Sequence, residues 1–167
     1  VEINYVQKLD RFLHDVSENS KAIMLFEQNK YSEAFALFKQ LAEEAPSVQS
    51  LNNLAWMYLR EEEDMDEAKR LLHQALVLQP QSSFPYMMLG EIALHKKQFK
   101  QAKSYLQTAL SHSLTEEATY NLAIVHFKLK EYVQAAKLFA SCVGDSGMTQ
   151  LHEVAAWMHA GNEGQAK

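Results

Sequence analysis

The sequence predicts an all-α protein built from stacked antiparallel helix pairs, and three observations support this fold class. First, related segments return every 33 or 34 residues along the chain. Second, apolar residues within each segment recur at i, i+3, i+4 and i+7, which is the spacing of one face of an α-helix. Third, the 167 residues include only 5 Gly and 3 Pro, which leaves little material for the turns of an all-β fold.

A recurring alanine marks the second helix of each repeat. Residues 29–46, 63–80, 97–114 and 130–147 superimpose without gaps. Each segment has a large apolar residue three positions before the alanine and another four positions after it. The alanines are Ala34, Ala68, Ala102 and Ala135, preceded by Tyr31, Met65, Phe99 and Tyr132 and followed by Phe38, Leu72, Leu106 and Phe139.

The first helix of each repeat lies upstream in the same phase, over residues 19–28, 53–60, 89–96 and 122–129. Each of these segments carries a small residue, which is Ala22, Ala55, Gly90 or Ala123. Small residues on both helices let the two backbones approach closely, and few residues separate the helices. One such pair cannot bury its apolar face alone, so the pairs are expected to stack.

This pattern resembles the tetratricopeptide repeat (TPR) family, whose unit reads W-x2-L-G-x2-Y, then A-x3-F-x2-A, then P. The closest match joins Leu54-Ala55-x2-Tyr58 to Ala68-x3-Leu72-x2-Ala75 and Pro80, and further matches lie at Leu89-Gly90 and Leu122-Ala123. Two departures are Lys21, which stands at the first unit's Leu, and the missing closing Pro of the fourth unit. The resemblance implies a right-handed superhelical α-solenoid with repeats at 15–47, 48–82, 83–115 and 116–149.

The two ends depart from the repeats. Residues 1–14 are expected to form an N-terminal cap or an extension of the first helix, on the strength of an apolar stripe. The stripe comprises Ile3, Tyr5, Val6, Leu9, Phe12, Leu13 and Val16. Residues 150–167 are expected to form part of a fifth repeat or a C-terminal capping helix, with a turn at 161–167. Trp157 and Met158 would then lack a covering helix, so we expect a truncated chain or, less favoured, completion by a partner.

Composition limits the classes of partner and compartment. The chain has 16 basic and 21 acidic residues, a net charge of −5, which disfavours a broad nucleic-acid-binding face. Its single cysteine, Cys142, excludes an internal disulfide framework and fits the reducing cytoplasm. No apolar run reaches the roughly 18–20 residues that a membrane span needs.

No motif for catalysis, cofactor binding or metal binding is found. Phosphate-binding and nucleophile-elbow glycine motifs are missing. His152 and His159 are seven positions apart, about 10.5 Å along a helix, so they cannot share one zinc ion. His126 and Cys142 are expected to be buried structural residues. We therefore predict a protein that is not an enzyme and that needs no cofactor and no metal.

Two charged segments favour solvated turns over binding sites. The acidic segment at 61–67 precedes a helix, where negative charge suits the helix N-terminus. The basic residues between 95 and 103 form a local turn that could contact RNA or acidic lipid, although the net acidity opposes this.

The resemblance implies a concave groove lined by the first helix of each repeat, with an apolar and aromatic floor and spaced amides. Asparagine can donate to and accept from the backbone of an extended peptide, and Trp is frequent at binding hot spots. The expected lining residues are Asn19 and Ile23; Asn52, Asn53, Trp56 and Arg60; Phe84, Met87, Met88, Glu91 and His95; and Tyr120, Asn121, Ile124 and Lys128.

Two binding modes of the family can be compared with these residues. Asn53 and Asn121 match the asparagine ladder that holds extended peptides, whereas Ser20 and Met88 do not. Of the clamp that binds a chaperone's C-terminal carboxylate, only Asn53 fits, because Phe84 and Met88 replace the cations.

The predicted function is a non-enzymatic protein–protein interaction module, an adaptor that binds a peptide or helix of a partner in the groove. One alternative is a structural or self-associating scaffold that uses its terminal faces. A second alternative is a secretion-type chaperone, because the size, acidity and N-terminal helix of the chain resemble those of such chaperones. Neither nucleic acid nor a membrane span is expected.

Overall fold

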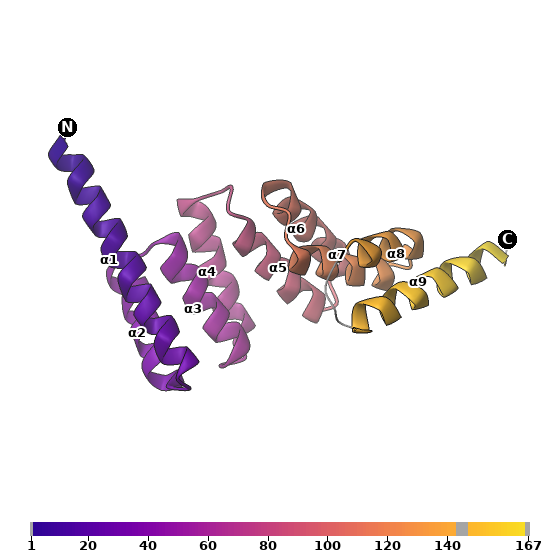
Figure 1. Ribbon diagram of the computed structural model, residues 1–167, viewed down its shortest axis with the longest axis horizontal. Helices are drawn as coiled ribbons and strands as arrows, with labels where there is room; N and C mark the ends of the chain where they lie inside the picture. Colours follow the sequence, from indigo (N-terminus) through magenta and orange to yellow (C-terminus); the bar gives the residue numbers. More distant parts are fainter. Residues whose placement is uncertain (1, 143–146, 166–167) are drawn as a thin grey trace. The chain divides into compact units, whose positions relative to one another are not determined.

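A computed structural model describes residues 2–142 and 147–165, and all regular structure in these two ranges is helical (Figure 1). This confirms the predicted all-α class. The chain divides into two compact units, Val1–Pro80 and Gln81–Lys167.

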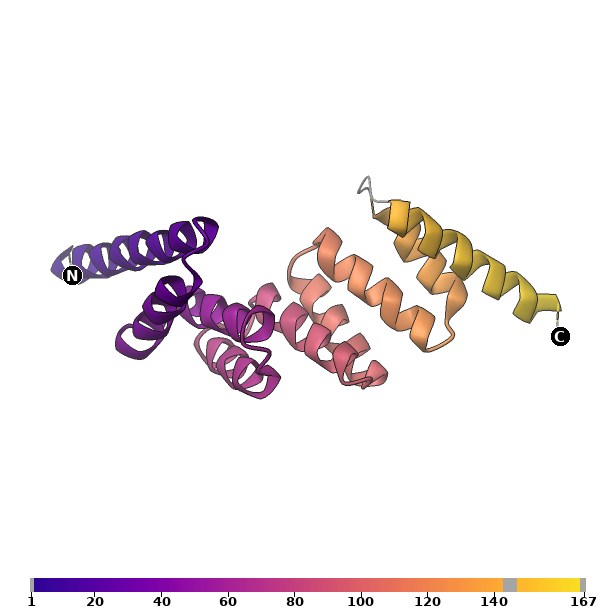
Figure 2. The ribbon, with the colours of Figure 1, turned by 90° about the horizontal axis from the view of Figure 1, so that it is seen from below.

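The first unit contains two helix pairs: α1 (Glu2–Glu27) with α2 (Tyr31–Glu44), and α3 (Val48–Arg60) with α4 (Met65–Leu78). With 26 residues against 14, α1 runs well beyond its partner α2 (Figure 2). The predicted N-terminal stripe therefore continues directly into the first repeat helix. Leu9 and Leu13 are 44% and 55% exposed, whereas the side chains of Ile3, Tyr5, Val6 and Phe12 lie outside the described residues. Lys21 is exposed and does not interrupt the helix.

The second unit contains α5 (Ser83–His95) with α6 (Phe99–His112), α7 (Glu116–Lys128) with α8 (Tyr132–Ser141), and then α9 (Gly147–Gln165). The turn predicted at residues 161–167 is wrong as far as Gln165, because α9 continues through Gly161. A glycine in a helix costs only about 1 kcal/mol, which a helix packed along its preceding turns can absorb.

Each pair turns back through a residue in the left-handed region. The residues are Asn29, Glu63, Lys97 and Lys130, with φ between 53° and 63°. After α5, Lys97 N–H donates to Leu94 and Gln98 N–H donates to Ala93, which is the Schellman pattern of helix termination. The turns after α1 and α7 repeat this pattern, whereas the turn after α3 is one residue longer.

The pairs pack through the small residues that the sequence places at fixed positions. Ala22, Ala55 and Ala123 are fully buried, and so are the four alanines of the second helices. At Gly90 the two helices approach closely, since a Cβ atom there would lie 2.6 Å from Cγ of Leu106 on α6. The apolar cores of both units therefore lie between the two helices of each pair.

Side-chain hydrogen bonds cap the N-termini of several helices. Before α3, Ser47 and Ser50 form a reciprocal capping box. In the acidic segment 61–67, Asp64 accepts from the backbone N–H of Glu67, and Glu67 pairs with Arg70. These carboxylates thus cap and charge the start of α4.

Candidate functional site

In the first unit, a buried amide pair joins the first helices of neighbouring repeats. Asn19 of α1 is fully buried, and its Oδ1 accepts a hydrogen bond of 2.9 Å from Nδ2 of Asn53 on α3. This pair uses one of the two N–H groups of the Asn53 amide, and Asn53 itself is half-buried. The sequence predicted both residues as groove-lining, but not that they would bond to each other.

Asn52, the neighbour of Asn53, has a buried acceptor with no donor. Its Oδ1 has no hydrogen-bond partner among the described residues, although the side chain as a whole is half-buried. A buried polar atom without a partner costs roughly 1–3 kcal/mol, so a donor brought to it would be favoured.

An aromatic cluster lies beside these amides. The rings of Trp56 (α3) and Phe26 (α1) meet edge to face with centroids 5.1 Å apart, and Phe26 meets Tyr31 in the same way at 5.0 Å. Trp56 and Phe26 are half-buried, so each keeps part of its ring accessible. Ile23 is 38% exposed and Arg60 is exposed. The face that combines Asn19, Asn52, Asn53, Trp56, Ile23, Phe26 and Arg60 is called the α1–α3 face below.

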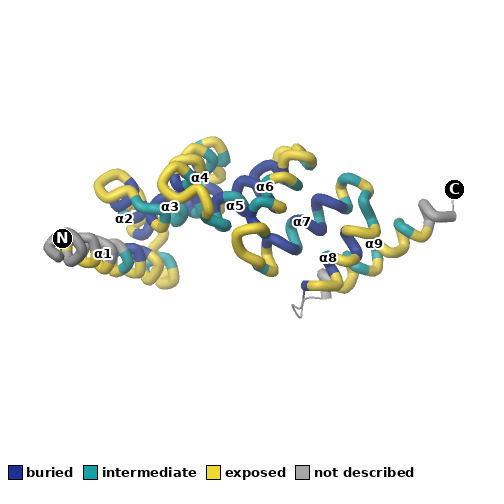
Figure 3. The backbone as a smooth tube through the Cα atoms, turned by 90° about the horizontal axis from the view of Figure 1, so that it is seen from above, coloured by how far each residue is buried: buried dark blue, intermediate teal, exposed yellow. Residues whose placement is uncertain are grey.

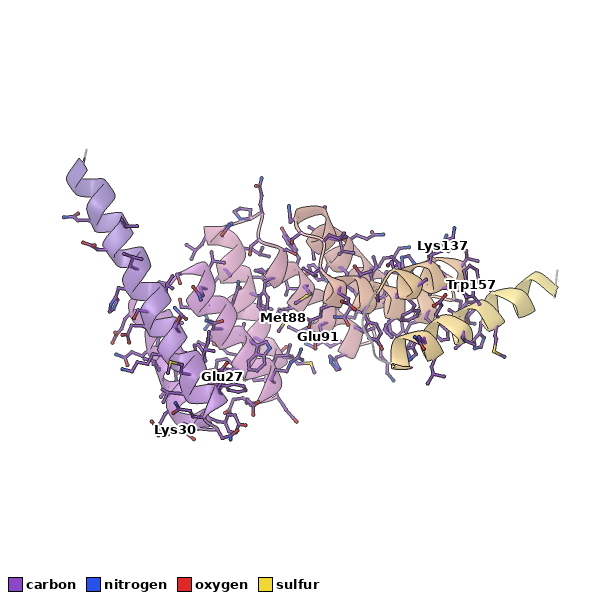
Figure 4. The ribbon with its side chains drawn as sticks, in the orientation of Figure 1. Glu27, Lys30, Met88, Glu91, Lys137 and Trp157 are labelled. Atoms are coloured by element: carbon purple, nitrogen blue, oxygen red, sulfur yellow. The ribbon has the colours of Figure 1, made fainter. Side chains whose placement is uncertain are left out.

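In the second unit, three of the residues expected on α5 lie inside. Met88 is 1% exposed, Met87 6% and Glu91 9%, so these side chains offer little surface to a partner. Figure 4 labels Met88 and Glu91. The helix α5 is apolar on several sides and packs against both α6 and α7. Phe84 is half-buried. His95 is exposed, with its Nε2 3.9 Å from Oε1 of Glu91.

The next first helix, α7, presents a more accessible set. Tyr120, Asn121 and Ile124 are half-buried and Lys128 is exposed. The hydroxyl of Tyr120 lies 3.0 Å from Nδ1 of His152 on α9, which fixes the tyrosine side chain. Asn121 has no comparable hydrogen bond in the part of the chain that the structure describes. The candidate surface of this unit therefore centres on α7.

A polar cluster links α6 to the turn after α7. Nζ of Lys103 is 3.0 Å from both carboxylate oxygens of Glu131, and Nδ1 of the buried His126 is 3.3 Å from Oε2 of Glu131. The His126 contact is not aligned as a hydrogen bond. Burial lowers the pKa of His126, and Lys103 adds to this while Glu131 opposes it. The hydrogen bond from Lys103 lowers the pKa of Glu131.

This cluster is a structural feature that sequence reasoning did not assemble. Lys103 and His126 each stand out in the sequence, but nothing there connects them with Glu131, because Glu131 lies 28 residues from Lys103. Lys103, one of the four lysines of the predicted basic turn, lies within α6 and pairs with this carboxylate.

The other residues that could carry chemistry, two histidines and the cysteine, make packing contacts. His152 and His159 both face aromatic rings, with His159 stacked on Tyr132 at 4.9 Å. Cys142 is buried, its Sγ lies 3.4 Å from the carbonyl oxygen of Leu138, and burial raises the pKa of its thiol. Among the described residues, no group of three or more His, Cys, Asp or Glu is placed to hold a metal ion. None of the described helices is long and apolar enough to cross a membrane.

Comparison with known families gives the class of protein. One tetratricopeptide repeat model matches residues 19–83 and 87–147, and a second matches residues 59–113. The first covers more than half of the chain, so the chain belongs to the tetratricopeptide repeat family. Repeats of this family are generally non-catalytic interaction modules, and the protein is accordingly a protein–protein interaction module.

Individual relatives share the repeat and the fold. Human protein O-mannosyl-transferase TMTC3 is 35% identical over 86 residues, which are 51% of this chain and 9% of that protein. A crystal structure of MamA superimposes with a TM-score of 0.70 at 18% identity, covering 91% of this chain and 85% of that one. PilF of Pseudomonas aeruginosa gives 0.79 at 16% identity, covering 92% and 72%. At these identities the two structures show the fold alone.

Proposed function

We propose that the chain is an adaptor that binds an extended peptide or a helix of another protein along its first helices. The observation that carries this proposal is the α1–α3 face, where amides and partly accessible aromatic rings lie together. The Asn19–Asn53 bond holds the two helices in register, and Trp56 and Phe26 supply an apolar corner.

The chemistry of this face favours a peptide with an apolar anchor next to accessible backbone. An aliphatic or aromatic side chain would fill the Phe26–Trp56 corner, as aromatic residues often do at binding hot spots. The remaining N–H and the carbonyl oxygen of Asn53 suit a peptide C=O and N–H, whatever the peptide's side chains are. For a short peptide we expect a dissociation constant in the micromolar range, about −8 kcal/mol.

A carboxylate-terminal chaperone peptide is not the proposed ligand, because Met88 is buried where that mode needs a cation. The proposal also assigns the chain no catalytic step. Its cytoplasmic location and the secretion-chaperone alternative stay predictions.

Affinity capture from cell lysate can test the proposal. Wild type is compared with the double variant Asn53→Ala/Trp56→Ala and with the control His73→Ala/Gln74→Ala, which changes exposed residues of α4. We expect a protein that wild type and the control retain and the first variant loses. Equal capture by all three forms would overturn the proposal and place the contact elsewhere on the molecule.

A peptide from the captured protein then locates the contact. Trp157→Phe leaves Trp56 as the only tryptophan of the two in the chain, so its fluorescence reports on the α1–α3 face alone. We expect a saturable change in Trp56 emission on titration. A peptide that binds by calorimetry without changing this emission would contradict binding at the α1–α3 face.

A further inference from the structure

The two units of the chain differ in charge. The first unit has 8 basic and 14 acidic residues, a net charge of −6, whereas the second has 8 basic and 7 acidic residues, a net charge of +1. Six of the 8 basic residues of the second unit lie between positions 96 and 130. The acidity of the chain as a whole is therefore carried by the first unit, and the second unit has a local excess of positive charge.

These six lysines belong to two turns of the second unit. Four come from the turn after α5 and the start of α6, and two come from the end of α7 and the turn that follows it. They are Lys96, Lys97, Lys100 and Lys103, and Lys128 and Lys130. Figure 2 shows both turns at the same edge of the second unit.

The contact between Lys103 and Glu131 joins the two turns. Nζ of Lys103 lies 3.0 Å from both carboxylate oxygens of Glu131. Lys100 is three residues before Lys103 on α6, and Lys130 precedes Glu131 directly in the chain. The contact therefore brings the lysines of both turns onto one surface. The six lysines and Glu131 are called the lysine edge below.

Most of the positive charge of the lysine edge faces solvent. Four of the six lysines are exposed and have no carboxylate partner among the described residues. These four are Lys97, Lys100, Lys128 and Lys130. Figure 3 colours the turn after α5 as exposed. Like charges gathered on one surface repel one another, so an anionic partner would relieve this repulsion.

We propose that the lysine edge binds an acidic segment of a partner protein. Carboxylates complement exposed ammonium groups, and a run of Asp or Glu residues can reach several lysines at once. The second unit contains no arginine, so its cations act as point charges without the bidentate geometry that a guanidinium supplies. Such contacts recognise the density of negative charge in a segment and not one particular sequence.

An acidic peptide fits this edge better than RNA or a membrane does. Single-stranded RNA stacks its bases on accessible aromatic rings, but Phe127 and Tyr132 pack on each other with centroids 5.2 Å apart, and Tyr132 stacks on His159 at 4.9 Å. A long RNA or an anionic membrane also presents charge over a larger area, which the net charge of −5 repels. A short acidic segment contacts only the edge, and salt screens charges beyond about 8 Å.

Fluorescence anisotropy of a labelled hexaglutamate peptide tests the proposal on the full chain. We expect saturable binding at about 50 mM NaCl that becomes about tenfold weaker at about 300 mM, because salt screens exposed charges. Lys100→Gln/Lys128→Gln should weaken binding about fivefold. The control Lys21→Gln/Lys39→Gln makes the same charge change on exposed residues of α1 and α2 and should have less than about a twofold effect. Equal weakening by both variants, or a wild type that does not bind, would overturn the proposal.

Glu131→Gln tests the proposal in the opposite direction. It removes the carboxylate of the lysine edge and releases Lys103, so hexaglutamate should bind about threefold more tightly. A variant that only disturbs the fold would bind more weakly, and circular dichroism checks that the helices remain. Unchanged or weaker binding by folded Glu131→Gln would contradict the proposal.

Competition distinguishes an acidic peptide from other anions. A mixed-sequence single-stranded RNA and vesicles that contain phosphatidylserine are each added to the hexaglutamate complex. We expect each to displace the peptide only at a higher concentration of negative charge than unlabelled hexaglutamate needs. Displacement at a lower concentration would overturn the proposal in favour of that anion.

This proposal and the proposed function can fail separately. Asn53→Ala/Trp56→Ala should leave hexaglutamate binding unchanged. Lys100→Gln/Lys128→Gln should in turn leave the Trp56 emission change of the captured peptide unaltered. Loss of hexaglutamate binding in Asn53→Ala/Trp56→Ala would place the acidic segment on the α1–α3 face and overturn its assignment to the lysine edge.

Discussion

The first helices of the two units present different chemistry from the same repeat. In the first unit, α1 and α3 are joined by the Asn19–Asn53 hydrogen bond and expose part of an aromatic cluster. In the second unit, α5 buries Met87 and Met88, and α7 is tied to α9 through Tyr120. The repeat thus determines which positions face a neighbouring helix, whereas the individual residues determine whether those positions become core or surface. Binding is expected where buried polarity and accessible rings coincide.

The largest expected effect concerns a feature that the two units share. Phe139 and Phe38 occupy the same repeat position and are 1% and 3% exposed. Replacing either with alanine should destabilise its own unit by about 3–5 kcal/mol, through lost apolar burial and a cavity. Hydrogen exchange of each unit's amides would measure this. Phe139→Ala should also loosen α9, because Phe139 stacks on His152 with ring centroids 5.3 Å apart. Unchanged protection throughout the second unit would contradict this.

The next largest effect is expected to differ between the two units, and it concerns one asparagine in each. Asn53→Ala removes a donor from the fully buried Asn19 and should destabilise the first unit by about 1–3 kcal/mol. Asn121→Ala changes the amide of α7 that has no comparable bond, and should alter the second unit by less than about 0.5 kcal/mol. Urea unfolding monitored for each unit by exchange or proteolysis would compare them. Equal changes in the free energy of unfolding would mean that the Asn19–Asn53 hydrogen bond does not stabilise the first unit.

A pH effect is expected in the second unit. The pKa of His126 is lowered from its ordinary 6.5 mainly by burial, so the unfolded chain binds the proton more readily than the folded one. The stability of the second unit is therefore full above pH 6.5 and falls as the pH drops below it. Glu131 has a pKa lowered from 4.5 by Lys103, so its contribution is present above pH 4.5 and is lost below.

Unfolding midpoints of the second unit between pH 7.5 and 5 would measure the contribution of His126 to its stability. In His126→Gln the unfolding midpoint should no longer change with pH in this range, whereas the decline below pH 4.5 should remain. The first unit is an internal control, because its described histidines, His14 and His73, are exposed. A slope that persists in His126→Gln would assign the pH dependence to another group.

The sequence was sufficient for the fold because the repeat encodes it redundantly. The alanines of four second helices, the small residues of four first helices and the period of 33 or 34 residues all specify the same packing. The predicted surface was less accurate, because a position in the repeat does not determine how deeply the side chain that stands there is buried. Met88 was expected in a groove by its position, yet it is 1% exposed, whereas Asn53 at the equivalent position of α3 is half-buried.

Other features of the site depend on residues distant in sequence. Asn19 and Asn53 are 34 residues apart, and Lys103 and Glu131 are 28 apart. Neither pair forms a motif, because each residue alone is ordinary for a helix or turn surface. The helical course of residues 161–165 was missed for a local reason, since glycine signals a turn whenever tertiary contacts are not considered.

The smallest predicted effect uses the turns that the units share. Lys97 in the second unit and Asn29 in the first both end a helix in the left-handed region, with φ of 59° and 62°. Lysine has a Cβ that disfavours this region, so Lys97→Gly should stabilise the second unit by about 0.5–1 kcal/mol.

Asn29→Gly should gain less, or lose stability. Asparagine tolerates the left-handed region better than lysine, and its Oδ1 accepts a 2.8 Å hydrogen bond from the hydroxyl of Tyr31 that glycine would remove. Thermal unfolding of the two variants gives the comparison, with Lys97→Ala as a control that keeps the Cβ and should not stabilise. A gain for Asn29→Gly as large as that for Lys97→Gly would show that backbone strain dominates both turns and that the side-chain bond of Asn29 has no net value.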